Sequence, residues 1–244
     1  MTTTTAPINP YSTPNSDLEM PQTRSHEGGS LESGIAGEYD FTIQAMLSEA
    51  WAKTNGLKGS FWGAALLLMV GVLLIAGGLG FALGTGGMAT QLIVQLAIMA
   101  FMYPFMAGIL MMGVKRSVDQ PISFNMMFSY FSVTGTVILA GLFSTILTWV
   151  GFLLLIIPGL YLAIAYGLII PLIADKKLSA WQAMEASRKA ITKRWFKIFG
   201  LYLVMGVILV ISAIPLGLGL VWTYPMMVSL MGILYREIFG VTSA

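Results

Sequence analysis

The sequence predicts an all-α integral membrane protein with six transmembrane helices. Three observations lead to this prediction: the chain is 57% hydrophobic and only 10% charged, three long stretches lack any charged residue, and the basic residues gather beside those stretches. A soluble domain usually carries about 25% charged residues. A chain of 244 residues has too small an interior to bury so much apolar surface, so lipid must solvate much of it.

Residues 1–39 differ in composition from the rest and are rich in Thr, Ser, Pro, Gly and Glu. With so few large apolar side chains, this segment cannot offset the entropy that it would lose on ordering. We therefore expect an acidic, disordered cytoplasmic tail, followed by a membrane domain over residues 40–240.

Each uncharged stretch has room for two membrane-spanning helices. The stretches are residues 59–114, 120–174 and 198–235, and one spanning helix needs about 20 residues. We place the six spans near residues 61–83, 90–113, 133–151, 153–174, 198–214 and 217–235. Glycine-rich segments mark the first and third turns. The middle turn has two candidate positions, Trp149–Gly151 and Pro158–Gly159.

The basic residues predict the orientation of these spans. Twelve of the thirteen Lys and Arg residues lie beside the membrane on one side of this topology, and the three connections on the other side carry no charge. Cytoplasmic loops are enriched in Lys and Arg. We therefore expect that side, and with it both termini, to be cytoplasmic.

A short amphipathic segment precedes each pair of spans. The three segments lie near residues 41–57, 122–131 and 178–197, and each places apolar side chains at helical spacing. The third begins with Ser179 and Gln182, a capping-box signature. The recurring order of an interfacial helix and a helical hairpin predicts three parallel copies of one unit.

The third segment carries the candidate binding surface. The residues expected to engage lipid or a second membrane protein are Trp181, Arg188, Lys189, Lys193, Arg194, Trp195 and Lys197. Basic residues next to a membrane gain about 1 kcal/mol each from an anionic leaflet. A solvated helix face and a topology signal are open alternatives for the same stripe. Nucleic-acid binding is not expected for basic residues held against a membrane.

Charge links this segment to the tail. Residues 175–197 carry seven basic and two acidic side chains, whereas residues 1–40 carry one basic and six acidic side chains. A tethered acidic tail would compete with lipid for the basic helix at a raised effective concentration. We therefore predict that the tail weakens lipid binding, and the alternative is a spacer that touches nothing.

The predicted spans hold no group suited to catalysis. The chain has no Cys, its single His is His26 in the tail, and no span contains an ionisable residue. Acid–base catalysis needs a positioned carboxylate or His, and metal sites need clusters of such ligands. Ion-coupled transporters usually keep an ionisable residue within the bilayer. We therefore expect a protein that is not an enzyme and that has no cofactor and no metal site.

Gln91 and Gln95 are the most polar residues within the predicted spans, and they lie one turn apart on the second span. Hydrogen bonding between helices is the expected role for such side chains. A lining for a polar path through the bilayer is the alternative.

Three segments, together with Ser187 and Thr223-Tyr224-Pro225, carry a family resemblance, and Asn9-Pro10-Tyr11 with Pro14 resembles a short element at the start of many bacterial membrane proteins. The three segments are Ser48-Glu49-Ala50-Trp51, Ile157-Pro158-Gly159-Leu160-Tyr161, and residues 171–184 with the order Pro-Leu-Ile-Ala-Asp-Lys-Lys-Leu-Ser-Ala-Trp-Gln-Ala-Met. With them, the chain from Gly37 onward resembles a loose group of bacterial inner-membrane proteins. This group includes the YciC-like proteins and the membrane domain attached to some glycerophosphodiester phosphodiesterases. The resemblance implies a helical protein of the bacterial inner membrane, and it implies no activity.

The sequence favours a non-enzymatic inner-membrane protein. We expect an accessory or envelope-organising role, in which the cytoplasmic amphipathic helices engage membrane lipids or a membrane partner. The alternative from a different class is a passive carrier or flippase for a lipid or an apolar solute. A lipid-accessible groove containing Gln91 and Gln95 would favour the carrier, and a closed, tightly packed bundle would favour the accessory role.

Overall fold

The computed structural model describes residues 28–84 and 87–242, and within these ranges the chain is helical and has no strand. The first four helices are α1 (Leu31–Ala36), α2 (Ile43–Thr54), α3 (Lys58–Leu83) and α4 (Met88–Ser117). The middle of the chain forms the 3-10 helices η1 (Phe124–Phe128) and η2 (Phe131–Val133), then α5 (Thr134–Leu154), α6 (Ile156–Ala165) and α7 (Ile169–Lys176). The last helices are α8 (Ala180–Lys193), α9 (Trp195–Ala213) and α10 (Leu220–Phe239).

The all-helical, membrane-like character predicted from the sequence is confirmed. Five helical segments among the described residues are long and apolar enough to cross a membrane: Lys58–Leu83, Met88–Ser117, Phe124–Leu154, Ile156–Lys176 and Trp195–Ala213. The sixth predicted span corresponds to α10, which is not among these five segments and is the central helix of the molecule. Most of its residues from Thr223 to Phe239 are buried, because α10 contacts α1, α2, α4 and α9.

The core forms where α10 crosses α4. Gly113 and Gly232 face each other at this crossing, and a Cβ atom on Gly232 would lie 2.2 Å from the backbone of Gly113. Any larger residue at Gly232 would therefore push the two helices apart, a use of small residues common where membrane helices pack. Around the crossing, Leu234 and Tyr235 of α10 pack with buried residues of α2, α7 and α8.

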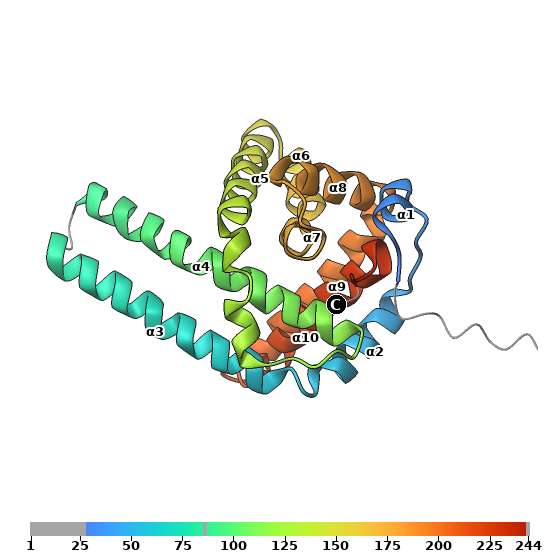
Figure 1. Ribbon diagram of the computed structural model, residues 1–244, viewed down its shortest axis with the longest axis horizontal. Helices are drawn as coiled ribbons and strands as arrows, with labels where there is room; N and C mark the ends of the chain where they lie inside the picture. Colours follow the sequence, from blue (N-terminus) through green and yellow to red (C-terminus); the bar gives the residue numbers. More distant parts are fainter. Residues whose placement is uncertain (1–27, 85–86, 243–244) are drawn as a thin grey trace, which may run out of the picture.

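Helical hairpins extend outward from this core (Figure 1). The α3–α4 hairpin, drawn in cyan and green, reaches furthest, and Phe81 near its outer end is 94% exposed. The α5–α6 hairpin leaves the core in a different direction. Both hairpins present large apolar side chains on their outer surfaces. Such surfaces suit lipid as the surrounding medium.

Both predicted positions for the middle turn are wrong. α5 ends at Leu154 and α6 begins at Ile156, so the turn lies at Leu155, between the two predicted positions. Gly151 stays inside α5. Pro158 lies in the first turn of α6, where a missing N–H group removes no hydrogen bond from the helix. The glycine and the proline therefore do not break the helices at their own positions.

The prediction of a disordered tail over residues 1–39 is wrong for residues 28–39. Ser30 and Ser33 cap α1 reciprocally, and Leu31 and Ile35 pack against the main core. Tyr39 is buried, and its hydroxyl donates to the backbone carbonyl of Ala190 at 2.8 Å. A few apolar side chains suffice here because a folded surface of α8 and α10 already exists to receive them. Residues 1–27 lie outside the described residues.

The predicted amphipathic segments have different outcomes. The first becomes α2 and the third becomes α8, but α9 already begins at Trp195, inside the predicted third segment. The second, residues 122–131, is not an α-helix and forms η1 with a turn toward η2. Its backbone approaches α4 so closely that a Cβ atom on Gly108 would lie 2.4 Å from the Cα atom of Met127. This contact and a cluster of Phe rings around Phe105 accompany the tighter winding.

Candidate functional site at helix α8

Helix α8 starts where the sequence predicts. The backbone N–H of Ser179 donates to the side-chain oxygen of Gln182 at 3.1 Å, and the hydroxyl of Ser179 accepts from the backbone N–H of Gln182 at 3.4 Å. The apolar stripe of α8 is also real, because Met184 and Ile191 are fully buried. The stripe packs into the core of the protein itself, so the side of α8 that faces outward is its polar and basic side.

A break between α6 and α7 ties α8 to the predicted fourth span. Residues 166–168 are not α-helical, and most of their backbone groups bond to the neighbouring turns of α6 and α7. Ser187 of α8 supplies two further bonds at this break, because its hydroxyl donates to the carbonyl of Ala165 at 2.7 Å and accepts from the N–H of Leu168 at 3.3 Å. All three residues are fully buried. Nearby, Tyr161 and Thr192 share a hydroxyl–hydroxyl hydrogen bond of 2.6 Å.

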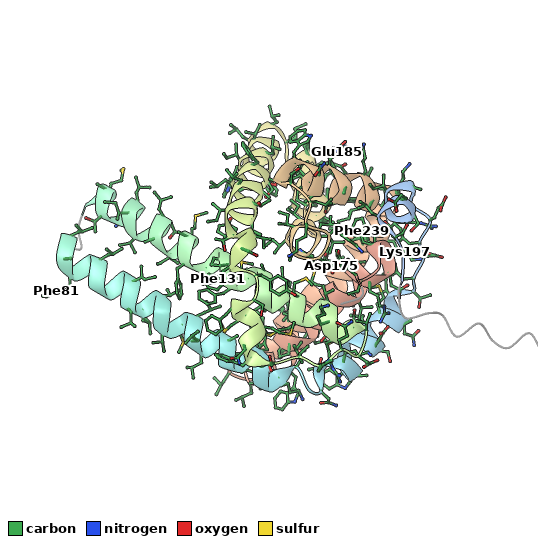
Figure 2. The ribbon with its side chains drawn as sticks, in the orientation of Figure 1. Phe81, Phe131, Asp175, Glu185, Lys197 and Phe239 are labelled. Carbon is green, nitrogen blue, oxygen red and sulfur yellow. The ribbon has the colours of Figure 1, made fainter. Side chains whose placement is uncertain are left out.

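The outward side of α8 carries the charges. Glu185 accepts two hydrogen bonds from the Nη2 atom of Arg188, at 2.8 and 2.9 Å, and it pairs with Lys189 at 3.2 Å. Figure 2 shows Glu185 on the outer side of α8. The Lys189 side chain is half exposed. Lys193 is also exposed, and it has no ion pair within the described part of the chain.

The segment before α2 crosses the end of this basic surface. Asp40 forms an ion pair with Lys197 and another with Arg194 at 3.7 Å. The hydrogen bond from Lys197, and then the one from the backbone of Phe41, hold the pKa of Asp40 below its usual value. Hydrogen bonding from Arg188, followed by that from Lys189, likewise lowers the pKa of Glu185. Both carboxylates are therefore ionised at neutral pH, and they neutralise only part of the positive charge.

Two hollows share Tyr166 as a wall, and the first of them lies against α8. The first has a volume of about 290 Å³ and is lined by Tyr166, Trp181, Met184, Glu185 and Arg188. The second has a volume of about 230 Å³ and is lined by Ser144, Thr145, Thr148, Trp149, Ala163 and Tyr166. Hydroxyl and indole groups on α5, followed by Tyr166, thus lead to a charged pair on α8. The linings of the two hollows therefore mix polar and apolar groups.

The structure separates the two tryptophans of the predicted surface. Trp181 is 69% exposed beside the first hollow. Trp195 instead stacks on Phe199, with ring centroids 5.1 Å apart, and its indole N–H is buried without a partner among the described residues. Trp195 therefore contributes to packing, and the exposed aromatic neighbour at this end is Phe196, which sequence reasoning missed.

Gln91 and Gln95 lie away from α8. Both side chains are exposed on the outer part of α4, and neither lines the two hollows beside Tyr166. Sequence reasoning also missed Asp40 and Tyr166, because only the tertiary structure brings them to α8. Within residues 28–84 and 87–242, no group of three or more His, Cys, Asp or Glu side chains is placed to hold a metal ion.

No protein-family model, curated protein or solved structure matches the chain. The function must therefore be inferred from the geometry of the site.

Proposed function

We propose that this protein is a non-enzymatic, multi-pass bacterial inner-membrane protein that binds anionic lipid through the outward face of α8, in an accessory or envelope-organising role. The observation that carries the proposal is the combination of exposed Lys189, Lys193 and Arg194 with the exposed aromatic residues Trp181 and Phe196. Basic side chains attract an anionic leaflet, and aromatic rings favour the headgroup level.

The distribution of charge supports a cytoplasmic position for α8. Ion pairs join α2 to α10 through Glu49 and Arg236 at 2.6 Å, and join α2 to the end of α4 through Lys53 and Asp119 at 2.5 Å. These pairs and α8 lie near the core end of the molecule. Figure 2 shows Lys197 and the apolar Phe81 at opposite ends of the view. The proposed topology keeps the charged end and both termini on the cytoplasmic side.

The proposal retains three units, each made of a cytoplasmic-side segment and a hairpin. The units are α2 with α3–α4, the 3-10 helices with α5–α6, and α8 with α9–α10, and the same order of elements supports them. The six predicted spans correspond to the arms of these hairpins. A passive lipid carrier receives less support, because Gln91 and Gln95 lie apart from the hollows beside α8.

Lipid retention tests the proposal. The full chain is purified from native membranes, and the ratio of bound phosphatidylglycerol to protein is measured by mass spectrometry at low and high salt. Replacing Lys189, Lys193 and Arg194 by Gln removes three charges worth about 1 kcal/mol each, so anionic-lipid affinity is expected to fall about 100-fold at low salt. The difference is expected to shrink at high salt, where exposed charges are screened.

Lys53→Gln is the matched control. It also removes one positive charge on the same side, but the Lys53 side chain is only 15% exposed and is paired with Asp119. We expect Lys53→Gln to change lipid retention much less than Lys193→Gln does. Equal retention by the wild type and the triple variant would contradict the proposal. A protein that copurifies with the wild type and is lost from the triple variant, with lipid unchanged, would instead assign α8 to a protein partner.

A further inference from the structure

The α5–α6 hairpin is short on the side that faces α8. α6 contains ten residues, which at 1.5 Å per residue rise about 15 Å. At the inner end of α6, Ala165 is bonded to Ser187 of α8. Nearer the turn, the Tyr161 hydroxyl is hydrogen-bonded to Thr192 of α8. Tyr161 is only six residues from Leu155, or about 9 Å of helical rise. The turn at Leu155 therefore lies about 15 Å of helix beyond the Ala165 contact with α8, and only about 9 Å of helix beyond the Tyr161 contact.

The position of α8 then limits the depth of the turn. α8 carries exposed charges on Lys189, Lys193 and Glu185, so it lies at or outside the headgroup level. The hydrocarbon core of a bilayer is about 30 Å thick. A hairpin that extends about 15 Å beyond the cytoplasmic headgroups reaches at most about the middle of the bilayer and falls short of the water on the far side.

The chemistry of the turn matches a position in hydrocarbon. No polar or charged side chain occurs from Val150 to Leu160. The five residues from Leu153 to Ile157 are between 68% and 86% exposed, so no part of the described protein covers them. Five exposed Leu and Ile side chains would be costly in water. Polar groups of the same hairpin, namely Ser144, Thr145, Thr148 and Trp149, line the hollow that shares Tyr166 with the hollow beside α8.

The backbone at the turn is nearly continuous with the two helices. The N–H of Leu155 donates to the carbonyl of Gly151 at 3.0 Å, and the carbonyl of Leu155 accepts from Gly159 at 3.5 Å. The two glycines also let the helices meet closely, because a Cβ atom on Gly151 would lie 3.0 Å from the Cα atom of Gly159. Pro158 has no N–H group at a position where one would lack a helical partner. The backbone is therefore hydrogen-bonded up to Leu155 on one side and from Gly159 on the other, and the N–H groups of Ile156 and Ile157 between them have no partner within their helix.

We infer that α5–α6 is a re-entrant hairpin that enters the bilayer from the cytoplasmic side and ends in the hydrocarbon, with its turn against lipid acyl chains. The predicted third and fourth spans then do not cross the membrane. The remaining topology is unaffected, because a re-entrant hairpin starts and ends on the same side. This inference rests on the proposed cytoplasmic headgroup position of α8.

Single-cysteine labelling tests the inference, and the native chain has no cysteine to interfere. The variants are Leu155→Cys at the turn, Met88→Cys at the outer end of α4, which is 81% exposed, and Lys193→Cys on α8. Each is treated with a membrane-impermeant maleimide in intact spheroplasts and in inverted vesicles. We expect Met88→Cys to react from outside, Lys193→Cys to react from inside, and Leu155→Cys to react at least tenfold more slowly from either side. Leu155→Cys is expected to react fully after denaturation in SDS.

The outcomes separate the two proposals. Reaction of Lys193→Cys from outside would overturn the cytoplasmic position of α8. If Lys193→Cys reacts from inside, rapid reaction of Leu155→Cys from outside shows a crossing hairpin and overturns only the re-entrant one. Rapid reaction of Leu155→Cys from inside also overturns it, because the turn would then lie in cytoplasmic water. A nitroxide at position 155 that collides with oxygen far more often than with a nickel chelate would support the position in hydrocarbon.

Discussion

Replacing Ser187 by Ala should destabilise the protein at the break between α6 and α7. The Ser187 hydroxyl is hydrogen-bonded to the carbonyl of Ala165 and to the N–H of Leu168, and all three residues are fully buried. The substitution leaves one buried acceptor and one buried donor without this partner. An unsatisfied buried polar group costs about 1–3 kcal/mol, so the expected loss is about 3 kcal/mol. For a chain of this size, that corresponds to a fall in the melting temperature of about 6–12 °C.

Ser144→Ala supplies the matched control for this measurement. The Ser144 hydroxyl donates to the carbonyl of Gly141 at 3.0 Å within its own helix. That carbonyl lies in the middle of α5, where the backbone N–H four residues later is its normal partner. We therefore expect Ser144→Ala to lower the free energy of unfolding by less than about 0.5 kcal/mol.

The assay is thermal unfolding of the purified chain in detergent, together with hydrogen exchange measured at the Leu168 amide. Ser187→Ala should accelerate exchange at Leu168 and leave exchange within α3 unchanged. If Ser187→Ala and Ser144→Ala lower the melting temperature equally, or if exchange at Leu168 does not change, the hydroxyl does not hold the break closed and the reasoning fails.

Three further predictions concern the membrane and the charges. Leu155→Lys should destabilise the inserted protein by about 3 kcal/mol if the turn lies in hydrocarbon, and the measured effect is a reduced yield of folded protein. Met88→Lys should be tolerated. Equal yields of the two variants would contradict a turn in hydrocarbon. Because the pKa values of Asp40 and Glu185 are lowered, their stabilising pairs persist above the unfolded values and are lost only as the pH falls through the lower folded values. Loss of these pairs should therefore leave the melting temperature unchanged between about pH 5 and pH 8. A fall in the melting temperature within this range that disappears in the Asp40→Asn variant would refute the prediction. Deleting residues 2–27 should raise retention of anionic lipid at low salt and have less effect at high salt, and equal retention at low salt would leave the spacer interpretation.

The sequence was sufficient for features that depend on local composition. A stretch without charge is apolar wherever it lies, so the helical, membrane-like segments could be predicted from hydropathy alone. The start of α8 could be predicted because a capping box satisfies backbone groups within a few residues of each other. The basic residues of α8 could be predicted to be exposed, since a charged side chain is rarely buried without a partner.

The sequence could not show what covers an apolar surface. The absence of charge from residues 198–235 predicts α10 as a span like the others, yet α10 is buried by protein because Gly113 and Gly232 allow it to cross α4 at backbone contact. The same limit applies to the apolar stripe of α8, which packs into the core of the protein. Hydropathy measures the free energy of transferring a side chain out of water. That transfer is favourable both into lipid and into a protein core, so hydropathy does not distinguish the two.

Tertiary structure alone decided the features that depend on residues far apart in the chain. Ser187 completes the backbone bonding at Ala165 and Leu168, and Tyr39 anchors a segment of low hydrophobicity to α8. The sequence determined that the α5–α6 hairpin is apolar, but its length relative to α8 follows only from the contacts that join them. Local periodicity reflects the preferences of each helix by itself. The depth of a segment, the burial of its side chains and their hydrogen-bond partners depend on the contacts that the helices make with one another.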